Sequence, residues 1–194
     1  SRQEIIRRYY NTRNDFLEGN VAQDCIYKIE LLMKQAGITK EDRLVVPAAL
    51  KLAEETGTPA AAIQLEDGSI ITGKTSDLLG ASAGLLLNAL KELAGIAHEI
   101  HVISPSAIQP IQDLKTAYLG SHNPRLHTDE VLIALSISAA TSADAKKAME
   151  QLPKLRGCEV HTSVMLSDVD RKTFKKLGVN LTCEPKYESS NLYH

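Results

Sequence analysis

The amino-acid sequence predicts an α/β fold: a three-layer-type sandwich with a mixed, largely parallel sheet, preceded by a small helical subdomain. Apolar residues recur at helical spacing as far as residue 57, and the period then changes to short strand-like runs. Beyond that point strands alternate with helices, and helical crossovers join parallel strands. We therefore expect a helical subdomain at residues 1–57 and an α/β domain at residues 58–194.

Three helices are expected in the first part of the chain. The first starts near Gln3, and the second follows Asn20. The third begins at a capping-box variant made by Thr39 and Asp42, and Pro47 restarts or kinks it. Each helix should end at a glycine, because glycine readily adopts the left-handed conformation that closes helices: Gly19, Gly37 and Gly57.

A β-hairpin should open the second part. Residues 60–65 and 69–72 are short strand-like runs, and the Asp-Gly pair between them is a strong turn signal. A long buried helix follows, capped by Thr75 or Ser76 and closed by Gly95. The remaining elements alternate: a strand at 99–104, a helix at 106–119, a broken helix at 128–152, a strand at 160–166, a helix at 168–177 and a strand at 179–184.

Composition and charge exclude several classes of function. The chain has 194 residues, of which 43% are hydrophobic and 24% charged, as in an ordinary globular protein. No apolar run approaches the roughly 20 residues of a membrane-spanning helix. The net charge of −2 attracts neither nucleic acid nor acidic lipid. The basic helix at residues 171–176 lacks aromatic neighbours for base stacking. We expect no nucleic acid and no membrane among the partners.

The cysteines and histidines predict neither disulfides nor a metal centre. Cys25, Cys158 and Cys183 are far apart and form no CxxC pair, which fits a reducing compartment, and we expect a cytoplasmic protein. His122 and His127 are the only candidate metal ligands, and they lack a fixed ligand spacing. We expect no metal and no cofactor.

Three stretches carry a resemblance to a known family: residues 3–10 (QEIIRRYY), 72–83 (TGKTSDLLGASA) and 122–132 (HNPRLHTDEVL). Over its whole length the sequence resembles the C-terminal part of the bacterial domain-of-unknown-function 1846 family, also called uncharacterised protein family 0371. The resemblance implies a further N-terminal domain as a partner, and the absence of an initiator methionine agrees with that expectation. It implies no reaction, and whether the protein is an enzyme stays open.

A second resemblance is topological. A hairpin, a buried helix and then alternating strands and helices are similar to the cytidine-deaminase-like sandwich, whose active site lies where two helix N-termini converge. The corresponding positions are residues 73–77 and 104–106. Deaminases hold zinc there with a His or Cys near a Glu and with Pro-Cys-x-x-Cys. Neither set is present, so zinc-dependent deamination is not expected.

The candidate site is the start of the helix after the hairpin. Residues 68–75 match the phosphate-loop pattern G-x-x-x-x-G-K-[ST], but their Ser-Ile-Ile-Thr centre prefers an extended strand. A narrower hypothesis is that free amides, hydroxyls and a cation at the helix start bind a small anion. The residues of this hypothesis are Gly73, Lys74, Thr75 and Ser76. The alternative is an ordinary capped helix start with a solvated lysine.

Three further residues complete the anion site if the fold brings them close: Ser106 at the next helix start, and Arg125 and His127 in the polar loop 121–130. Dense polar loops often carry sites. The last polar residues of this loop also suit a helix start, so capping is the alternative there. No catalytic residue is identified, because no Ser-His-Asp or Cys-His set follows from spacing alone.

Two functions from different classes follow from these observations. The leading hypothesis is a pocket for a small anionic or nucleotide-like ligand at a helix N-terminus, within a larger multidomain protein. The alternative is a non-catalytic structural or assembly module that forms a homo-oligomer. In that case the Ala/Gly-rich helix and the apolar first helix would supply the contacts between subunits.

Overall fold

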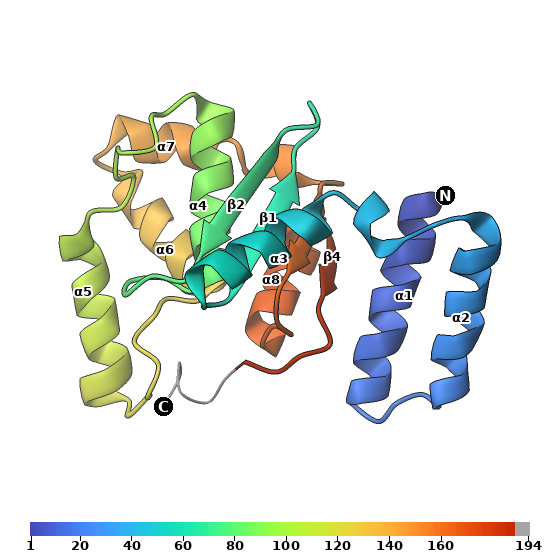
Figure 1. Ribbon diagram of the computed structural model, residues 1–194. Coiled ribbons are helices and arrows are strands. Elements are labelled where there is room, and N and C mark those ends of the chain that lie inside the picture. The colour runs from blue at the N-terminus through green and yellow to red at the C-terminus, as the bar shows by residue number, and fades with distance from the viewer. Residues whose placement is uncertain (189–194) are drawn as a thin grey trace.

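The fold is a four-stranded mixed sheet between two layers of helices (Figure 1), and the computed structural model describes residues 1–188. The strand order is β2-β1-β3-β4. The strands span Ala60–Gln64 (β1), Ile70–Lys74 (β2), Glu159–Thr162 (β3) and Asn180–Cys183 (β4). The predicted hairpin is confirmed, and so are the last two predicted strands.

The prediction of a largely parallel sheet is wrong. β1 pairs antiparallel with both β2 and β3, and within residues 1–188 the one parallel pair is β3 and β4, joined by α8 (Asp168–Leu177). The strand expected at 99–104 does not form. Val102 and Ile103 of that segment are buried in an irregular loop, so their side chains fill the core without backbone pairing. The cytidine-deaminase-like strand order is not confirmed.

The helices expected before residue 57 are confirmed. α1 spans Arg2–Leu17, α2 spans Gln23–Ala36 and α3 spans Val45–Thr56, with a 3₁₀ turn, η1, at Lys40–Asp42. Pro47 lies in the first turn of α3, where its missing N–H removes no helical hydrogen bond. Proline therefore restarts the helix after η1 and does not kink it.

Helices α1 and α3 cover one face of the sheet, and α2 lies outside α1 (Figure 1). Val45 and Ala49 of α3 pack against Ala62 of β1. Asn14 of α1 donates a hydrogen bond to the carbonyl oxygen of Cys183 in β4 (2.9 Å). α3 thus lies in the layer that covers the sheet, and the domain boundary at residue 57 stays a prediction.

The opposite face of the sheet carries the main core. α4 (Ala81–Ala94) packs on β1 and β2, α8 packs on β4, and α6 (Thr128–Ser138) and α7 (Ala143–Met149) pack against α4. α5 (Pro105–Asp113) continues into a π-helical turn, η2 (Leu114–Tyr118), and η3 (Leu152–Leu155) leads to β3. The predicted helices of this half are confirmed, including the break between α6 and α7. Within residues 1–188 no helix is both long and apolar enough to cross a bilayer.

The helix after the hairpin begins later than predicted. Gly73 and Lys74 belong to β2, and α4 starts one residue after Gly80. The intervening segment is tied to the loop before α6: Leu79 forms a parallel bridge with Leu126, and the amide of Gly80 donates to the carbonyl oxygen of Leu126 (3.2 Å). Backbone that pairs with another segment is not free to form a helix, so the helix start moves to the end of this bridge.

A buried arginine links the helical elements to the sheet. Arg43, between η1 and α3, is fully buried, and its Nη2 donates to carbonyl oxygens of both β3 and β4 (2.9 Å each). Its Nη1 donates to Glu159 (2.6 Å) and its Nε to the hydroxyl of Thr182 (3.0 Å). Thr182 lies 2.7 Å from Nδ1 of His161, and Nε2 of the same ring lies 2.8 Å from Glu184.

Candidate functional site

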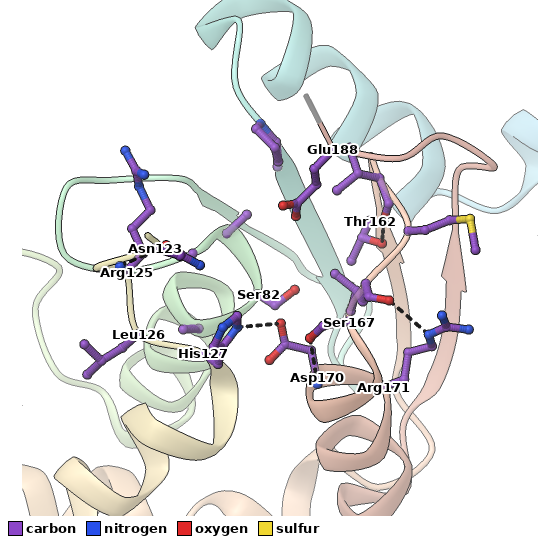
Figure 2. Close-up of a pocket in the computed structure, with 18 of the residues that line it drawn as sticks. Ser82, Asn123, Arg125, Leu126, His127, Thr162, Ser167, Asp170, Arg171 and Glu188 are labelled. Atoms are coloured by element: carbon purple, nitrogen blue, oxygen red, sulfur yellow. Dashed lines mark hydrogen bonds and ion pairs between the residues drawn. The ribbon is translucent and has the colours of Figure 1, made fainter. Parts of the chain in front are cut away.

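A cavity of about 250 Å³ lies where the first turns of α4, α6 and α8 converge (Figure 2). The start of β1 and the end of β3 form its floor, because the loops that lead into the three helices meet at this edge of the sheet. Its polar lining includes Ser82, His127, Thr162, Ser167 and Asp170, and Arg125, Arg171 and Glu188 also line it. Helix N-termini carry partial positive charge, so their convergence favours negative charge in the cavity.

The N-terminus of α4 is open toward this cavity. Its N-cap is Gly80, which has no side chain to accept a hydrogen bond from the first turn. The backbone amides of Ala81, Ser82 and Ala83 donate to no residue of the described part of the chain, and all three residues are buried. Each buried amide without a partner costs about 1–3 kcal/mol, which a ligand that accepts these hydrogen bonds would recover.

The other two helix starts are occupied by the chain itself. The backbone amide of Thr128, at the start of α6, donates to Oδ1 of Asp170 (2.9 Å). The amide of Asp170, in the first turn of α8, donates to the hydroxyl of Ser167 (3.4 Å). Of the three converging helices, α4 therefore offers the most unpaired backbone donors.

Ser82 adds a hydroxyl at the open helix start. Its side chain is 4% exposed, and its Oγ has no hydrogen-bond partner among the described residues. Figure 2 shows the Ser82 oxygen directed into the hollow between the His127 ring and Ser167. A buried hydroxyl usually has a partner, so this atom marks a place where a ligand group fits.

His127 and Asp170 form an ion pair on the opposite wall. Nδ1 of His127 lies 3.5 Å from Oδ2 of Asp170, and Oδ1 of Asp170 accepts from the hydroxyl of Thr128 (2.6 Å). The hydrogen bond to Asp170 raises the pKa of His127 above its ordinary value. Burial alone would raise the pKa of Asp170, but the hydrogen bonds from His127 and Thr128 outweigh burial and lower it. Both shifts favour the charged forms of the pair, the imidazolium of His127 and the carboxylate of Asp170.

The two arginines at the cavity are engaged with other groups. Nε of Arg125 donates to the carbonyl oxygen of Ser76 (2.6 Å), and Nε of Arg171 donates to that of Leu166 (3.0 Å). Figure 2 shows the guanidinium groups of Arg125 and Arg171 at opposite rims, and the Glu188 carboxylate above the hollow. An anion is therefore best placed at the α4 amides, on the far side of the cavity from Glu188.

The predicted site residues divide into two groups. Arg125 and His127 do line the cavity. The other five lie elsewhere: Gly73, Lys74, Thr75, Ser76 and Ser106. The helix start expected at residues 73–76 is wrong. Gly73 and Lys74 are in β2, and Thr75 and Ser76 are in the connection to α4. The residues that match the phosphate-loop pattern therefore form a turn, a strand and the start of a connection, and not a loop that leads into a helix. Ser106 is in the first turn of α5 and pairs with Ser104 through the two hydroxyls (3.0 Å).

Gly73 has a packing role at the position where the pattern predicts a phosphate contact. A Cβ at this residue would lie 2.3 Å from the backbone nitrogen of Leu85 and 2.5 Å from its Cα. β2 therefore crosses α4 at a distance that only glycine allows. Lys74 is exposed at the end of the strand, outside the cavity.

Sequence reasoning missed Ser82, Ser167 and Asp170. A sequence pattern could have indicated Ser82, because residues 80–84 read G-A-S-A-G and match the G-x-S-x-G pattern of serine nucleophiles. Ser167 with Asp170 three residues later is a helix-start pattern. No local sequence pattern predicts the pairing of Asp170 with His127, because the two residues are 43 positions apart.

Within the described part of the chain, no group of three or more His, Cys, Asp and Glu side chains is arranged to hold a metal ion. His122 is exposed in the loop before α6, whereas His127 faces the cavity. The arrangement around His127 is that of an acid–base pair, with a carboxylate that fixes one ring nitrogen.

Fold and cavity together define a class: an α/β protein with a small pocket at an uncapped helix N-terminus. The chain belongs to the family described as "Domain of unknown function DUF1846, C-terminal", which matches residues 41–193. UPF0371 proteins of Corynebacterium efficiens, Corynebacterium glutamicum and Streptococcus pyogenes serotype M5 are 56%, 53% and 51% identical to it. The predicted family is confirmed. Each match covers the whole of this chain but 39% of the relative, so the relatives contain further sequence.

Proposed function

We propose that the cavity binds a small molecule through an anionic group, a phosphate or a carboxylate, seated on the first turn of α4. The observation that carries the proposal is the set of buried donors without partners, the amides of residues 81–83 and the hydroxyl of Ser82. This keeps the ligand class that the sequence predicts and moves its site from residues 73–76 to residues 81–83.

The charges around the cavity support an anion at this place. The positive end of α4 favours negative charge, and so does the imidazolium form of His127, which the hydrogen bond to Asp170 stabilises by raising the pKa. The volume of about 250 Å³ is below the range of about 300–1,000 Å³ common for drug-sized ligands, so the ligand is small. A nucleotide would extend past the rim, with its phosphate alone inside.

Calorimetric titration of the purified chain with inorganic phosphate and with sulfate tests the proposal. We expect binding to the wild type and at least about tenfold weaker binding to Ser82→Ala, since a hydrogen bond to a charged group contributes roughly 1.5–3 kcal/mol. Ser136→Ala, an exposed serine on α6, is the matched control and should bind as the wild type does.

Lys74→Ala separates the two possible positions of the site. Lys74 lies outside the cavity, so we expect unchanged affinity for both anions. Loss of binding in Lys74→Ala with full binding in Ser82→Ala would return the site to residues 73–76. Absence of binding of either anion to the wild type would refute the anion pocket.

A second function, assembly, is supported by one exposed apolar pair. Ile133 and Ile137 lie one turn apart on α6 and are 59% and 68% exposed. We propose as the alternative that α6 contacts a second copy of the chain through these residues. Light scattering tests this: a dimer that Ile137→Lys converts to a monomer supports assembly, and a wild-type monomer contradicts it.

The cysteines support a reducing, cytoplasmic setting for either function. All three are free, and Cys158 and Cys183 are buried. Burial raises the pKa of both thiols, which keeps them protonated and unreactive.

A further inference from the structure

We propose that the cavity is the active site of a serine-type acyl transfer, in which Ser82 attacks a small carboxylic ester, His127 moves the proton and Asp170 positions His127. Ser82 comes from α4, His127 from the N-cap position before α6 and Asp170 from α8, and the three side chains face the same hollow in Figure 2. The inference rests on the proposed function in one respect, because the α4 amides that receive an anion would also receive the oxyanion of acyl transfer.

Ser82 has the surroundings of a nucleophile. Its hydroxyl is buried without a partner, at the second helical residue of α4, where the partial positive charge of the helix favours the alkoxide character that develops during attack. The G-x-S-x-G pattern of residues 80–84 usually places serine on a strained turn. Here no non-glycine residue of the described chain has positive φ, so the helix start presents the serine without strain.

His127 has the surroundings of the general base. Oδ2 of Asp170 faces Nδ1 of the ring, and the amide and hydroxyl of Thr128 hold Oδ1, so the carboxylate is fixed on one side and orients the ring on the other. With Nδ1 as the protonated nitrogen, Nε2 has the lone pair that accepts a proton. Asp170 is a positioning residue, since it acts through His127.

Ser82 and His127 make no hydrogen bond to each other in this structure. The His127 side chain is 35% exposed, so its ring has room to turn toward Ser82 when a ligand fills the hollow. Hydrogen bonds between catalytic groups are often long without substrate and shorten in the complex.

The open amides of residues 81–83 have the chemistry of an oxyanion hole. They are buried backbone donors, already oriented by the helix, and no side chain of the described residues caps them. Donors of this kind stabilise the negative oxygen of a tetrahedral intermediate, and removing one typically costs about 10²–10³ in rate.

The reaction balances without a further cofactor. Oγ of Ser82 bonds to the ester carbonyl carbon while its proton passes to Nε2 of His127, and the carbonyl electron pair becomes the oxyanion. Collapse of the intermediate breaks the carbon–oxygen bond of the leaving alcohol, which takes the proton from His127. Water then attacks the acyl carbon while its proton passes to Nε2 of His127. Collapse of this second intermediate breaks the bond between the acyl carbon and Oγ of Ser82, which takes the proton back from His127 as the carboxylic acid leaves.

The lining of the cavity limits the substrate class. Val164, Met165 and Leu166 give it one apolar wall beside the polar helix starts. A short acyl chain fits this wall and the volume of about 250 Å³. The chemistry therefore indicates an ester or thioester of a short carboxylic acid.

Labelling with a fluorophosphonate, which bonds to activated serines with loss of fluoride, tests the proposal on the purified chain. We expect one label per chain, located on Ser82 by mass spectrometry, and hydrolysis of p-nitrophenyl acetate by the same protein. Ser82→Ala should lose both, and Ser136→Ala should keep both. His127→Gln should slow labelling by about 10²–10⁴, the usual contribution of a general base.

Asp170→Asn provides a readout that a merely structural role would not move. Labelling should rise with pH through the raised pKa of His127, and Asp170→Asn should shift that rise to lower pH besides slowing the reaction. If this variant fails to fold, the rate of His127→Gln relative to the wild type decides the role of the base.

The outcomes distinguish the two proposals. Phosphate binding that depends on Ser82, without labelling of Ser82, refutes acyl transfer and leaves the anion pocket standing. Labelling of Ser82 without binding of phosphate or sulfate refutes the anion pocket and supports acyl transfer. Labelling of another residue, or an unchanged rate in His127→Gln, overturns the proposed roles.

Discussion

Replacing Gly73 by alanine should destabilise the fold strongly. The added Cβ would lie 2.3 Å from the backbone nitrogen of Leu85, 2.5 Å from its Cα and 2.8 Å from the carbonyl oxygen of Ala81. All three are backbone atoms of α4, so no side chain can rotate away to make room. The helix itself must move away from β2 (Figure 1).

The size of the effect follows from the distance that α4 must move. Ordinary contact begins at 3.4 Å, which is about 1.1 Å more than the 2.3 Å that the new Cβ would have. A gap of about 0.5–1 Å forfeits a quarter to a half of the dispersion energy between packed atoms. Overpacking usually costs roughly 1–3 kcal/mol, and a clash with backbone places Gly73→Ala at or above about 3 kcal/mol.

Thermal and urea unfolding of Gly73→Ala and Gly84→Ala measure this cost. A loss of about 3 kcal/mol should lower the Tm by roughly 6–12 °C in a chain of this length. Gly84 is the matched control, because its Cβ would lie 3.3 Å from the carbonyl oxygen of Lys74, and alanine inside a helix gains about 1 kcal/mol over glycine. We expect Gly84→Ala to be close to neutral. A Tm of Gly73→Ala equal to that of the wild type would refute the packing argument.

Three further predictions concern buried charges and histidines. Arg43→Met should cost about 3–5 kcal/mol in urea unfolding, because it leaves Glu159 and strand carbonyls without their buried partner, and Arg43→Lys should recover part of this. Burial lowers the pKa of His161, so the contribution of the neutral ring to stability is fully present above its ordinary pKa and is lost as pH falls through the lowered pKa. The destabilisation by His161→Gln should therefore be smaller at acid than at neutral pH. The hydrogen bond to Asp170 raises the pKa of His127, so sulfate affinity should fall as pH rises through that pKa, and His127→Gln should abolish this dependence in calorimetry.

Local patterns predict most elements, because they record which residues cap, end or line a helix. Gly37 and Gly57 end α2 and α3 at positive φ, as the sequence predicts. The prediction of a strand at 99–104 is wrong, and its residues show why. Its apolar residues predict burial, and Val102 and Ile103 are indeed buried, but burial in a loop and burial in a strand leave the same local pattern. Without this strand β3 pairs directly with β1, and this antiparallel pair is where the sheet departs from the prediction.

Of the seven candidate site residues that the sequence suggests, two line the cavity, and binding of an anion there stays a prediction. The sequence suggests Arg125 and His127 because polar loops often carry sites, and both residues do line the cavity. The open amides of a helix start were expected near Lys74 and are at residues 81–83. The helix begins later because Leu79 pairs with Leu126 in a parallel bridge. A contact between segments 47 positions apart has no local signal.

Gly80 offers the sharpest test of whether the open end of α4 serves function. Its φ of −66° suits any residue, and a Cβ there would meet only the carbonyl oxygen of Leu126, at an ordinary 3.7 Å. Neither sterics nor backbone conformation requires glycine, although aspartate at this position would cap the amides of Ser82 or Ala83. Gly80→Asp should therefore raise stability by a few tenths of a kcal/mol in urea unfolding while it abolishes sulfate binding and fluorophosphonate labelling. Gly80→Ala, which cannot cap, should retain both activities. If Gly80→Asp binds sulfate as the wild type does, the amides of α4 are not the binding site.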